Sequence, residues 1–230
     1  SSNDSGELFL WDLGADNPAP LGLVGHSGEV NALAFSPDGQ LLASAGRDLG
    51  ILLWDPVVGG LVYAEENAHI ANILTLAFSR DGQWLASSGE DREITLWAVF
   101  DAALFPFDTF SAHTNFVRAL AFSPDDHMVV SGSVDQLAAV WQVDYAGYGV
   151  LDVLGGALRR VVFSQDGTML AYGGQDNGLY VVDAAEATDV IAPIRAPAAV
   201  FAADFSRDDR MLGFGDLKGN LQVIATQTGR

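Results

Sequence analysis

The sequence has no cysteine, few basic residues and no long hydrophobic run. Without cysteine among its 230 residues, the chain has no disulfide and no thiolate ligand for a metal. No apolar run approaches the length of about 18 residues that a membrane-spanning helix needs, so we expect no membrane span. No secretory signal is visible in the first six residues, and the sequence does not begin with methionine. The compartment stays open, with the cytoplasm as the favoured alternative.

Positive charge is scarce. Only 11 lysines and arginines stand against 30 aspartates and glutamates, which gives a net charge of -19. Such an acidic surface repels phosphate groups, so we expect neither nucleic-acid binding nor binding to an anionic membrane. Solubility is the simplest reason for the charge, and adaptation to high salt or a basic partner are the alternatives. The four histidines leave little for a metal site, because three belong to a repeated motif and His127 is expected in a solvated turn. We expect no metal and no other cofactor.

The sequence repeats itself five times. Phenylalanines recur every 41 to 44 residues, and each begins a stretch of twenty residues that aligns with the others without gaps, as in FSPDGQLLASAGRDLGILLW and FSRDGQWLASSGEDREITLW. A fixed period of this length indicates stacked units, none of which buries its hydrophobic surface alone. The copies span residues 26–54, 69–97, 113–141, 154–182 and 196–224, after a partial copy at 7–25.

Each copy predicts four antiparallel strands. In the first copy the expected strands are Val30 to Phe35, Leu41 to Ala45, Ile51 to Trp54 and a weaker one at Leu61 to Ala64, separated by turn residues such as Pro37-Asp38-Gly39. The first strand is apolar at nearly every position, so we expect cover on both of its faces. Sheets packed face to face around a common axis would provide that cover.

Dipeptides at fixed positions connect the copies to a known family. Glycine or alanine precedes histidine ahead of the first strand, and tryptophan precedes aspartate at the end of a third strand (Gly25-His26, Ala68-His69, Ala112-His113, Trp11-Asp12, Trp54-Asp55). In these motifs the chain resembles the WD40-repeat β-propellers over residues 7 to 226. The resemblance implies an all-β fold of four-stranded antiparallel blades, here about five blades plus an incomplete one. It also implies a non-catalytic interaction or sensor module, part of a larger bacterial-type signalling or scaffold protein.

Three copies contain a histidine, a serine, an aspartate and a tryptophan at constant offsets. These residues could be read as a nucleophilic serine, its base and an orienting carboxylate. Catalysis needs one such set, however, and the sequence has three equivalent ones. We therefore expect a buried structural hydrogen-bond chain, which the family resemblance also implies. The four types are His26, His69 and His113; Ser44, Ser87 and Ser131; Asp48, Asp91 and Asp135; Trp54, Trp97 and Trp141.

The last two copies have lost this set. The fourth has Leu154, Tyr172, Asp176 and Val182 at these positions, and the fifth has Ala196, Phe214, Lys218 and Ile224. The loss costs little when buried donors and acceptors leave together.

The two ends of the chain leave open how the blades close. The pattern predicts 21 strands, with two ahead of the first full copy and three in the last. One reading closes a five-bladed ring by lending Leu21 to Val24 to the last blade as its fourth strand. The favoured reading is a segment of a larger propeller, or half of an assembly, whose unpaired blade edges would promote self-association.

The phasing places a group of residues on one rim near the axis. These are the residues at the start of each first strand or just before the turn aspartate, and they include three of the few arginines (Asn31, Leu74, Arg118, Arg159, Phe201, Arg47, Glu90, Val134 and Gln175, with Phe116 nearby). We expect Arg47, Arg118 and Arg159 to bind a protein or peptide with a carboxylate or phosphate, beside an aromatic anchor. The alternative is that each arginine pairs with a local acid. A hydrolase with an axial site is the second functional alternative, but the sequence has no unrepeated catalytic cluster.

Overall fold

The chain folds entirely into strands and turns. The computed structural model describes residues 6–14, 19–143, 148–152 and 156–226. These residues form strands β1 to β21, with no helix among them. The chain divides into two compact units, residues 1–110 and 111–230. The first two copies of the repeat lie in the first unit, and the other three lie in the second; Leu154, the expected start of the fourth copy, lies outside the described residues.

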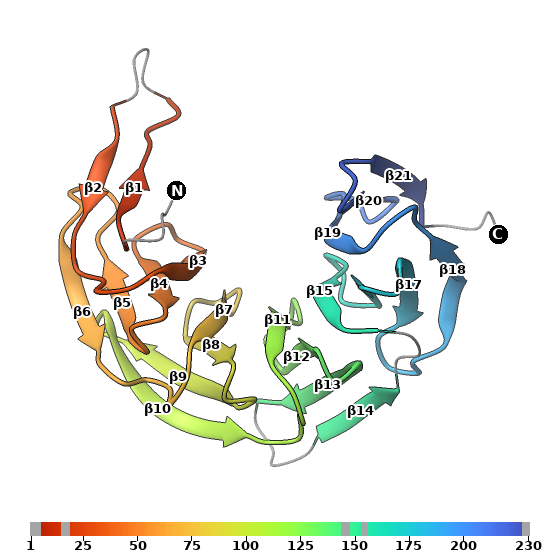
Figure 1. Ribbon diagram of the computed structural model, residues 1–230, viewed down its shortest axis with the longest axis horizontal. Coiled ribbons are helices and arrows are strands. Elements are labelled where there is room, and N and C mark those ends of the chain that lie inside the picture. The colour runs from red at the N-terminus through yellow and green to blue at the C-terminus, as the bar shows by residue number, and fades with distance from the viewer. Residues whose placement is uncertain (1–5, 15–18, 144–147, 153–155, 227–230) are drawn as a thin grey trace. The chain divides into compact units, whose positions relative to one another are not determined.

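The first unit holds a hairpin and two four-stranded antiparallel sheets, in which each strand pairs with the next along the chain (Figure 1). The hairpin consists of β1 (Leu8–Leu10) and β2 (Leu21–Leu23). The two blades are β3 (Val30–Phe35), β4 (Leu42–Gly46), β5 (Ile51–Trp54) and β6 (Leu61–Glu65), then β7 (Ile73–Phe78), β8 (Trp84–Gly89), β9 (Ile94–Phe100) and β10 (Ala103–Phe110).

The second unit holds two further four-stranded blades and a three-stranded sheet, all antiparallel. The first strands of neighbouring blades lie beside one another. The strands are β11 (Val117–Phe122), β12 (Met128–Ser133), β13 (Leu137–Gln142) and β14 (Tyr148–Asp152); β15 (Leu158–Phe163), β16 (Met169–Gly174), β17 (Gly178–Asp183) and β18 (Asp189–Arg195); and β19 (Val200–Phe205), β20 (Met211–Asp216) and β21 (Leu221–Ala225).

A serine-aspartate turn joins the first two strands of every blade. In the first blade, Ser36 Oγ donates to Asp38 Oδ1 at 2.7 Å and accepts the Leu41 N–H at 2.9 Å. Gly39 follows with a φ of +71°, which a residue without a Cβ adopts at no steric cost. In the last blade Asp209 stands at this position with a φ of +56°. Aspartate tolerates this conformation better than most residues.

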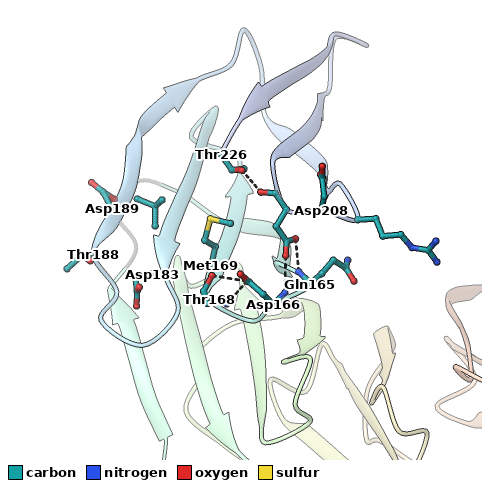
Figure 2. A pocket seen from close by; sticks show the side chains of 12 residues that line it. Gln165, Asp166, Thr168, Met169, Asp183, Thr188, Asp189, Asp208 and Thr226 are labelled. Atoms are coloured by element: carbon teal, nitrogen blue, oxygen red, sulfur yellow. Dashed lines mark hydrogen bonds between the residues drawn. The ribbon is translucent and has the colours of Figure 1, made fainter. Parts of the chain in front are cut away.

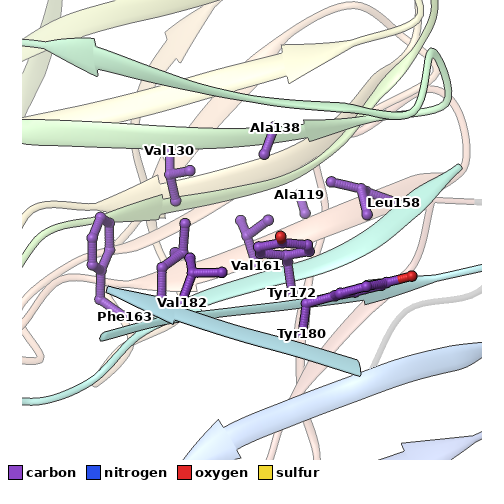
Figure 3. Close-up of a cluster of buried hydrophobic side chains, with 10 residues drawn as sticks. Ala119, Val130, Ala138, Leu158, Val161, Phe163, Tyr172, Tyr180 and Val182 are labelled. Carbon is purple, nitrogen blue, oxygen red and sulfur yellow. The ribbon is translucent and has the colours of Figure 1, made fainter. Parts of the chain in front are cut away.

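Neighbouring blades share one core. Figure 3 shows the cluster between the third blade (β11–β14) and the fourth (β15–β18), where Ala119 and Val130 meet Val161, Tyr172 and Val182. All five side chains are at most 6% exposed. Burial of each such aliphatic or aromatic side chain stabilises the fold by about 1.5 to 3 kcal/mol. The core is therefore made jointly by two blades, as the repeat pattern predicts.

The predicted all-β fold with four-stranded antiparallel blades is confirmed, but one alternative is not realised and one expectation is wrong. The alternative reading made Leu21 to Val24 the fourth strand of the last blade, whereas β2 pairs with β1 and the last sheet has three strands. The expected cover on both faces also fails for β3, where Leu33 is 43% and Phe35 is 54% exposed. The short β1–β2 hairpin packs on Val30 and its neighbours and leaves the far end of β3 uncovered.

Candidate functional site

The structure brings each repeated quartet together across one blade. In the first blade, His26 Nδ1 lies 2.7 Å from Asp48 Oδ2, and His26 Nε2 lies 2.7 Å from Ser44 Oγ. Trp54 Nε1 donates to the same Ser44 Oγ at 2.7 Å. The other two sets repeat this geometry, with corresponding distances of 2.7, 2.7 and 2.8 Å in the set of His69, Asp91, Ser87 and Trp97, and 2.9, 2.7 and 2.8 Å in the set of His113, Asp135, Ser131 and Trp141.

The indole sets the direction of this chain of hydrogen bonds, because its N–H can only donate. In the second blade Trp97 donates to Ser87. The hydroxyl hydrogen of Ser87 is then free to bond Nε2 of His69, and the Nδ1–H of the neutral imidazole donates to Asp91. Ser87 is 0% and His69 is 5% exposed. A serine that is closed to solvent and already bonded on both sides cannot reach a substrate. These hydrogen bonds connect the loop before the first strand of the blade to its second and third strands.

In the second and third blades, the aspartate of the hydrogen-bonded quartet is held in its charged form. Burial by itself raises the pKa of Asp91, but the hydrogen bond with His69, together with the N–H groups of Glu93 and Ile70, brings the pKa below its ordinary value of 3.8. For Asp135, burial again opposes the charged form, and the N–H groups of Thr114 and Leu137 with His113 lower the pKa.

The fourth blade keeps the aspartate and gives it other partners. Tyr180 Oη donates to Asp176 Oδ2 at 2.5 Å, and Arg195 Nη1 lies 3.3 Å from the same oxygen. The ring of Tyr172 stacks on that of Tyr180 with 5.2 Å between the centroids. Burial, then the charge of Asp189 and the neighbouring groups, raises the pKa of Tyr172 to about 12. The sequence pattern gave no signal for Tyr180 and Arg195, because neither stands at a repeated offset.

The last blade replaces the polar chain by hydrocarbon. Phe214 takes the place of the serine and is 2% exposed within the apolar cluster of this blade and the fourth. The turn is held two residues earlier than in the other blades: Asp216 accepts the N–H groups of Lys218 and Asn220, each at 3.0 Å. These bonds lower the pKa of Asp216, the side-chain bond from Asn220 most.

A β-bulge lies at the same place in the first strand of every blade. The pairing of this strand with the second strand skips one residue near its start, and these residues are Asn31, Leu74, Arg118, Arg159 and Phe201. A bulge redirects the side chain of its extra residue and is frequent beside binding sites. The skipped residues are the strand-start positions that the phase of the repeat places on the rim.

In the first unit the polar rim residues find partners nearby. Asn31 donates to the carbonyl of Ile73 in the next blade at 3.0 Å. Arg47 Nη1 lies 3.4 Å from Glu29 Oε2, with both side chains exposed to solvent. Glu90 accepts a hydrogen bond from Asn72 at 3.0 Å. The alternative that a rim arginine pairs with a local acid therefore describes Arg47.

The rim arginines of the second unit differ. The Nε atoms of Arg118 and Arg159 are buried without a hydrogen-bond partner, and neither guanidinium has an acid within ion-pair distance among the residues that the structure describes. Arg159 Cζ lies 5.3 Å from the centroid of the Phe201 ring, at cation–π distance. Burial, then the charge of Arg118, lowers the pKa of Arg159. Phe116, which precedes β11, is 36% exposed. We call Arg118, Arg159 and Phe201 the arginine surface.

The predicted rim residues thus fall into two groups. Arg47, Asn31 and Glu90 belong to the first unit, and Phe116 and the arginine surface belong to the second. The structure brings together Arg118, Arg159 and Phe201, which come from three successive blades.

An acidic pocket of about 880 Å³ lies between the turns of the last two blades (Figure 2). Asp209 connects these blades, since its carboxylate accepts the N–H groups of Gln165 and Asp166 at 2.7 and 2.9 Å. The other turn acids, such as Asp183, also accept backbone N–H groups. These carboxylates are thereby occupied in structural bonds. Within the described ranges no group of three metal-binding side chains occurs, and no helix there is long and apolar enough to cross a membrane.

Three of the repeats match the model of a known protein family. The family described as "WD40: WD domain, G-beta repeat" matches residues 20–55, 62–98 and 105–142. Each matched stretch ends one residue after the tryptophan of a quartet.

Several curated proteins are similar over short stretches. Ribosome assembly protein 4 of Chaetomium thermophilum is 43% identical over 56 residues, which are 24% of this chain and 11% of that protein. The small ribosomal subunit protein RACK1 of Medicago sativa is 57% identical over 42 residues, 18% of this chain and 13% of that protein. The Notchless protein homolog of Arabidopsis thaliana is 37% identical over 62 residues, 27% of this chain and 13% of that protein.

The chain thus spans only 11 to 13% of the length of these relatives in the matched stretches. The three matched repeats and the blades with their buried quartets identify this chain as a WD40-repeat protein.

Proposed function

We propose that this chain is a non-catalytic protein-interaction module that binds its partner through the arginine surface of the second unit. One observation carries the proposal: Arg118 and Arg159 lie close enough for one charge to lower the other's pKa, yet neither pairs with any of the described acids in a chain that has 30 of them. Two like charges without counter-charges are unfavourable in the free protein. A bound anion would remove that cost.

The partner that fits this surface is a protein or peptide segment with a carboxylate or a phosphate. The planar guanidinium presents several N–H donors in a fixed fork, which matches the paired oxygens of both groups. Phe201 is 43% exposed, and the contact of its ring with Arg159 favours one orientation of the arginine in the free protein. Exposed Phe116 is the further aromatic anchor that we include in the site.

The relatives support a scaffold role. Two of them are named as a ribosome assembly protein and as a small ribosomal subunit protein, which favours a role in macromolecular assembly. For this chain we infer a scaffold within a larger protein, in a signalling or assembly context, with the cytoplasm as its compartment. Binding through the nucleic acid backbone does not fit a net charge of -19.

A hydrolase is the weaker alternative. The serine, histidine and aspartate sets occur three times and serve as buried structural bonds, as in the set around Ser87. An active site would need an unrepeated acid, base or nucleophile that faces solvent.

Charge reversal tests the arginine surface. We expect Arg118→Glu with Arg159→Glu to reduce partner capture from native lysate at least tenfold, because the anion would meet two carboxylates instead of two guanidinium groups. Capture is quantified by mass spectrometry on immobilised protein. Arg207→Glu with Arg210→Glu is the matched control, since both are exposed arginines of the same unit and the change in net charge is the same. Undiminished capture by a folded Arg118/Arg159 variant would refute the assignment.

A further inference from the structure

Aromatic side chains gather on the outer hairpin of the second blade. Phe100 at the end of β9 is 73% exposed, and Phe105 and Phe107 on β10 are 52% and 57% exposed. Trp84 on β8 meets the ring of Phe107 edge to face, with 4.7 Å between the centroids. Exposed aromatic groups of this size mark interaction surfaces more often than scattered single residues do.

The strand register puts these rings on one face of the sheet. Ala98 of β9 pairs with Trp84 on one side and with Phe105 on the other. Directly paired residues share a face, and Phe100 shares it too because it follows Ala98 by two positions. Phe107 sits at a bulge between Pro106 and Asp108, and its contact with Trp84 brings it to the same face. We call Phe100, Phe105, Phe107 and Trp84 the hairpin face.

The β9–β10 hairpin itself carries charge of one sign. Asp101 and Asp108 lie on the hairpin and are exposed, and residues 94–117 contain no lysine or arginine; Arg80 stands in the turn that precedes Trp84. Asp101 lies in the hairpin turn, where its φ is +50°. Exposed rings beside the carboxylates of this hairpin are complementary to a guanidinium group, which stacks on aromatic rings and pairs with carboxylates.

We propose that the hairpin face binds an arginine-rich segment of a protein partner. Arginine side chains lie against the rings of Phe100 and Phe105, and the carboxylates of Asp101 and Asp108 attract and orient the segment. The net charge of -19 attracts a cationic segment at long range but does not determine where on the protein it binds. This surface is in the first unit and has the opposite chemistry to the arginine surface, so it is independent of the function proposed above.

Two labelled peptides of equal charge test the ring contribution. The probes are an octapeptide of four Gly-Arg repeats and one of four Gly-Lys repeats, titrated by fluorescence anisotropy at low and at 0.15 M salt as a standard condition. We expect the arginine peptide to bind more tightly, and Phe100→Leu with Phe105→Leu to weaken its binding by roughly tenfold. The leucines keep apolar surface and net charge and remove only the ring faces.

Controls separate the hairpin face from general attraction. Phe35→Leu removes a phenylalanine of similar exposure, 54%, from another blade and should leave the affinity unchanged. Asp101→Asn with Asp108→Asn should weaken both peptides more than Glu66→Gln with Glu186→Gln, which changes the net charge equally at other exposed sites. Asparagine tolerates the backbone of residue 101.

Two results would overturn the proposal. Equal affinity of the arginine peptide for the wild type and the Phe100/Phe105 variant would mean that net charge alone attracts it. A dimer in analytical ultracentrifugation that the same variant abolishes, with peptide affinity unaltered, would make a second copy of the chain the occupant instead.

Discussion

Replacing Phe214 by serine is expected to lower the free energy of unfolding by about 4 to 6 kcal/mol. Three other blades have serine at this position, so agreement among the repeats would favour the change. The structure predicts the opposite, because Phe214 is 2% exposed and packs in an apolar cluster with residues such as Val200 and Leu212. Serine would leave a cavity there, and its hydroxyl would find no histidine or indole, since Ala196 and Ile224 stand at those positions.

Urea unfolding of the variant measures this loss. Phe214→Leu is the matched control; it keeps most of the apolar volume and should cost less than about 2 kcal/mol. A loss below about 1 kcal/mol for Phe214→Ser would contradict the account, because it would show that the last blade accommodates the polar chain after all.

Ser87→Ala is expected to destabilise the protein by about 2 to 3 kcal/mol, although it removes only one oxygen. Ser87 accepts from the indole of Trp97 and bonds Nε2 of His69, both within 2.8 Å, and alanine leaves both buried groups without a partner. The remaining structure excludes water from the site, as the serine is 0% exposed.

The same denaturation experiment tests this prediction. Ser27→Ala serves as the control: Ser27 is exposed, and the change should stay within about 0.5 kcal/mol. Combining Ser87→Ala with His69→Leu should cost less than the sum of the single changes, because both remove the same bond. Strict additivity, or a loss for Ser87→Ala no larger than that of the control, would speak against a coupled network.

Much of the fold is readable from the sequence, because the phase of the repeat determines where each strand begins. The strand Ile51 to Trp54 was expected from its apolar run and forms β5 with these bounds. The pairing of β2 was not readable, since Leu21 to Leu23 has the same apolar character whichever strand it joins. The exposure of part of β3 was not predicted for a related reason. The hydrophobicity of a strand shows which side chains can be buried, but the size of the neighbouring sheet determines which of them are buried.

The candidate site was readable only in part. Constant offsets identified the quartets, whose members lie within hydrogen-bond distance in three blades. The same phasing pointed to Arg118, Arg159 and Phe201, but the bulge that presents each of them has no signature in an apolar strand. The contact of Arg159 with Phe201 joins residues from separate copies. Tyr180 and Arg195, which contact Asp176 in the fourth blade, stand at repeat positions that belong to none of the three quartets.

The unfolding free energy of Arg118→Gln tests the central claim most directly, namely that these arginines are kept unpaired for a partner and do not hold the fold together. Arg118 has a buried Nε without an acceptor and a like charge nearby in Arg159. Removal of that charge should therefore leave the stability unchanged or raise it, as is common where a site is maintained for function. A loss of more than about 1 kcal/mol would contradict the account, because it would mean that Arg118 makes a stabilising interaction in the free protein.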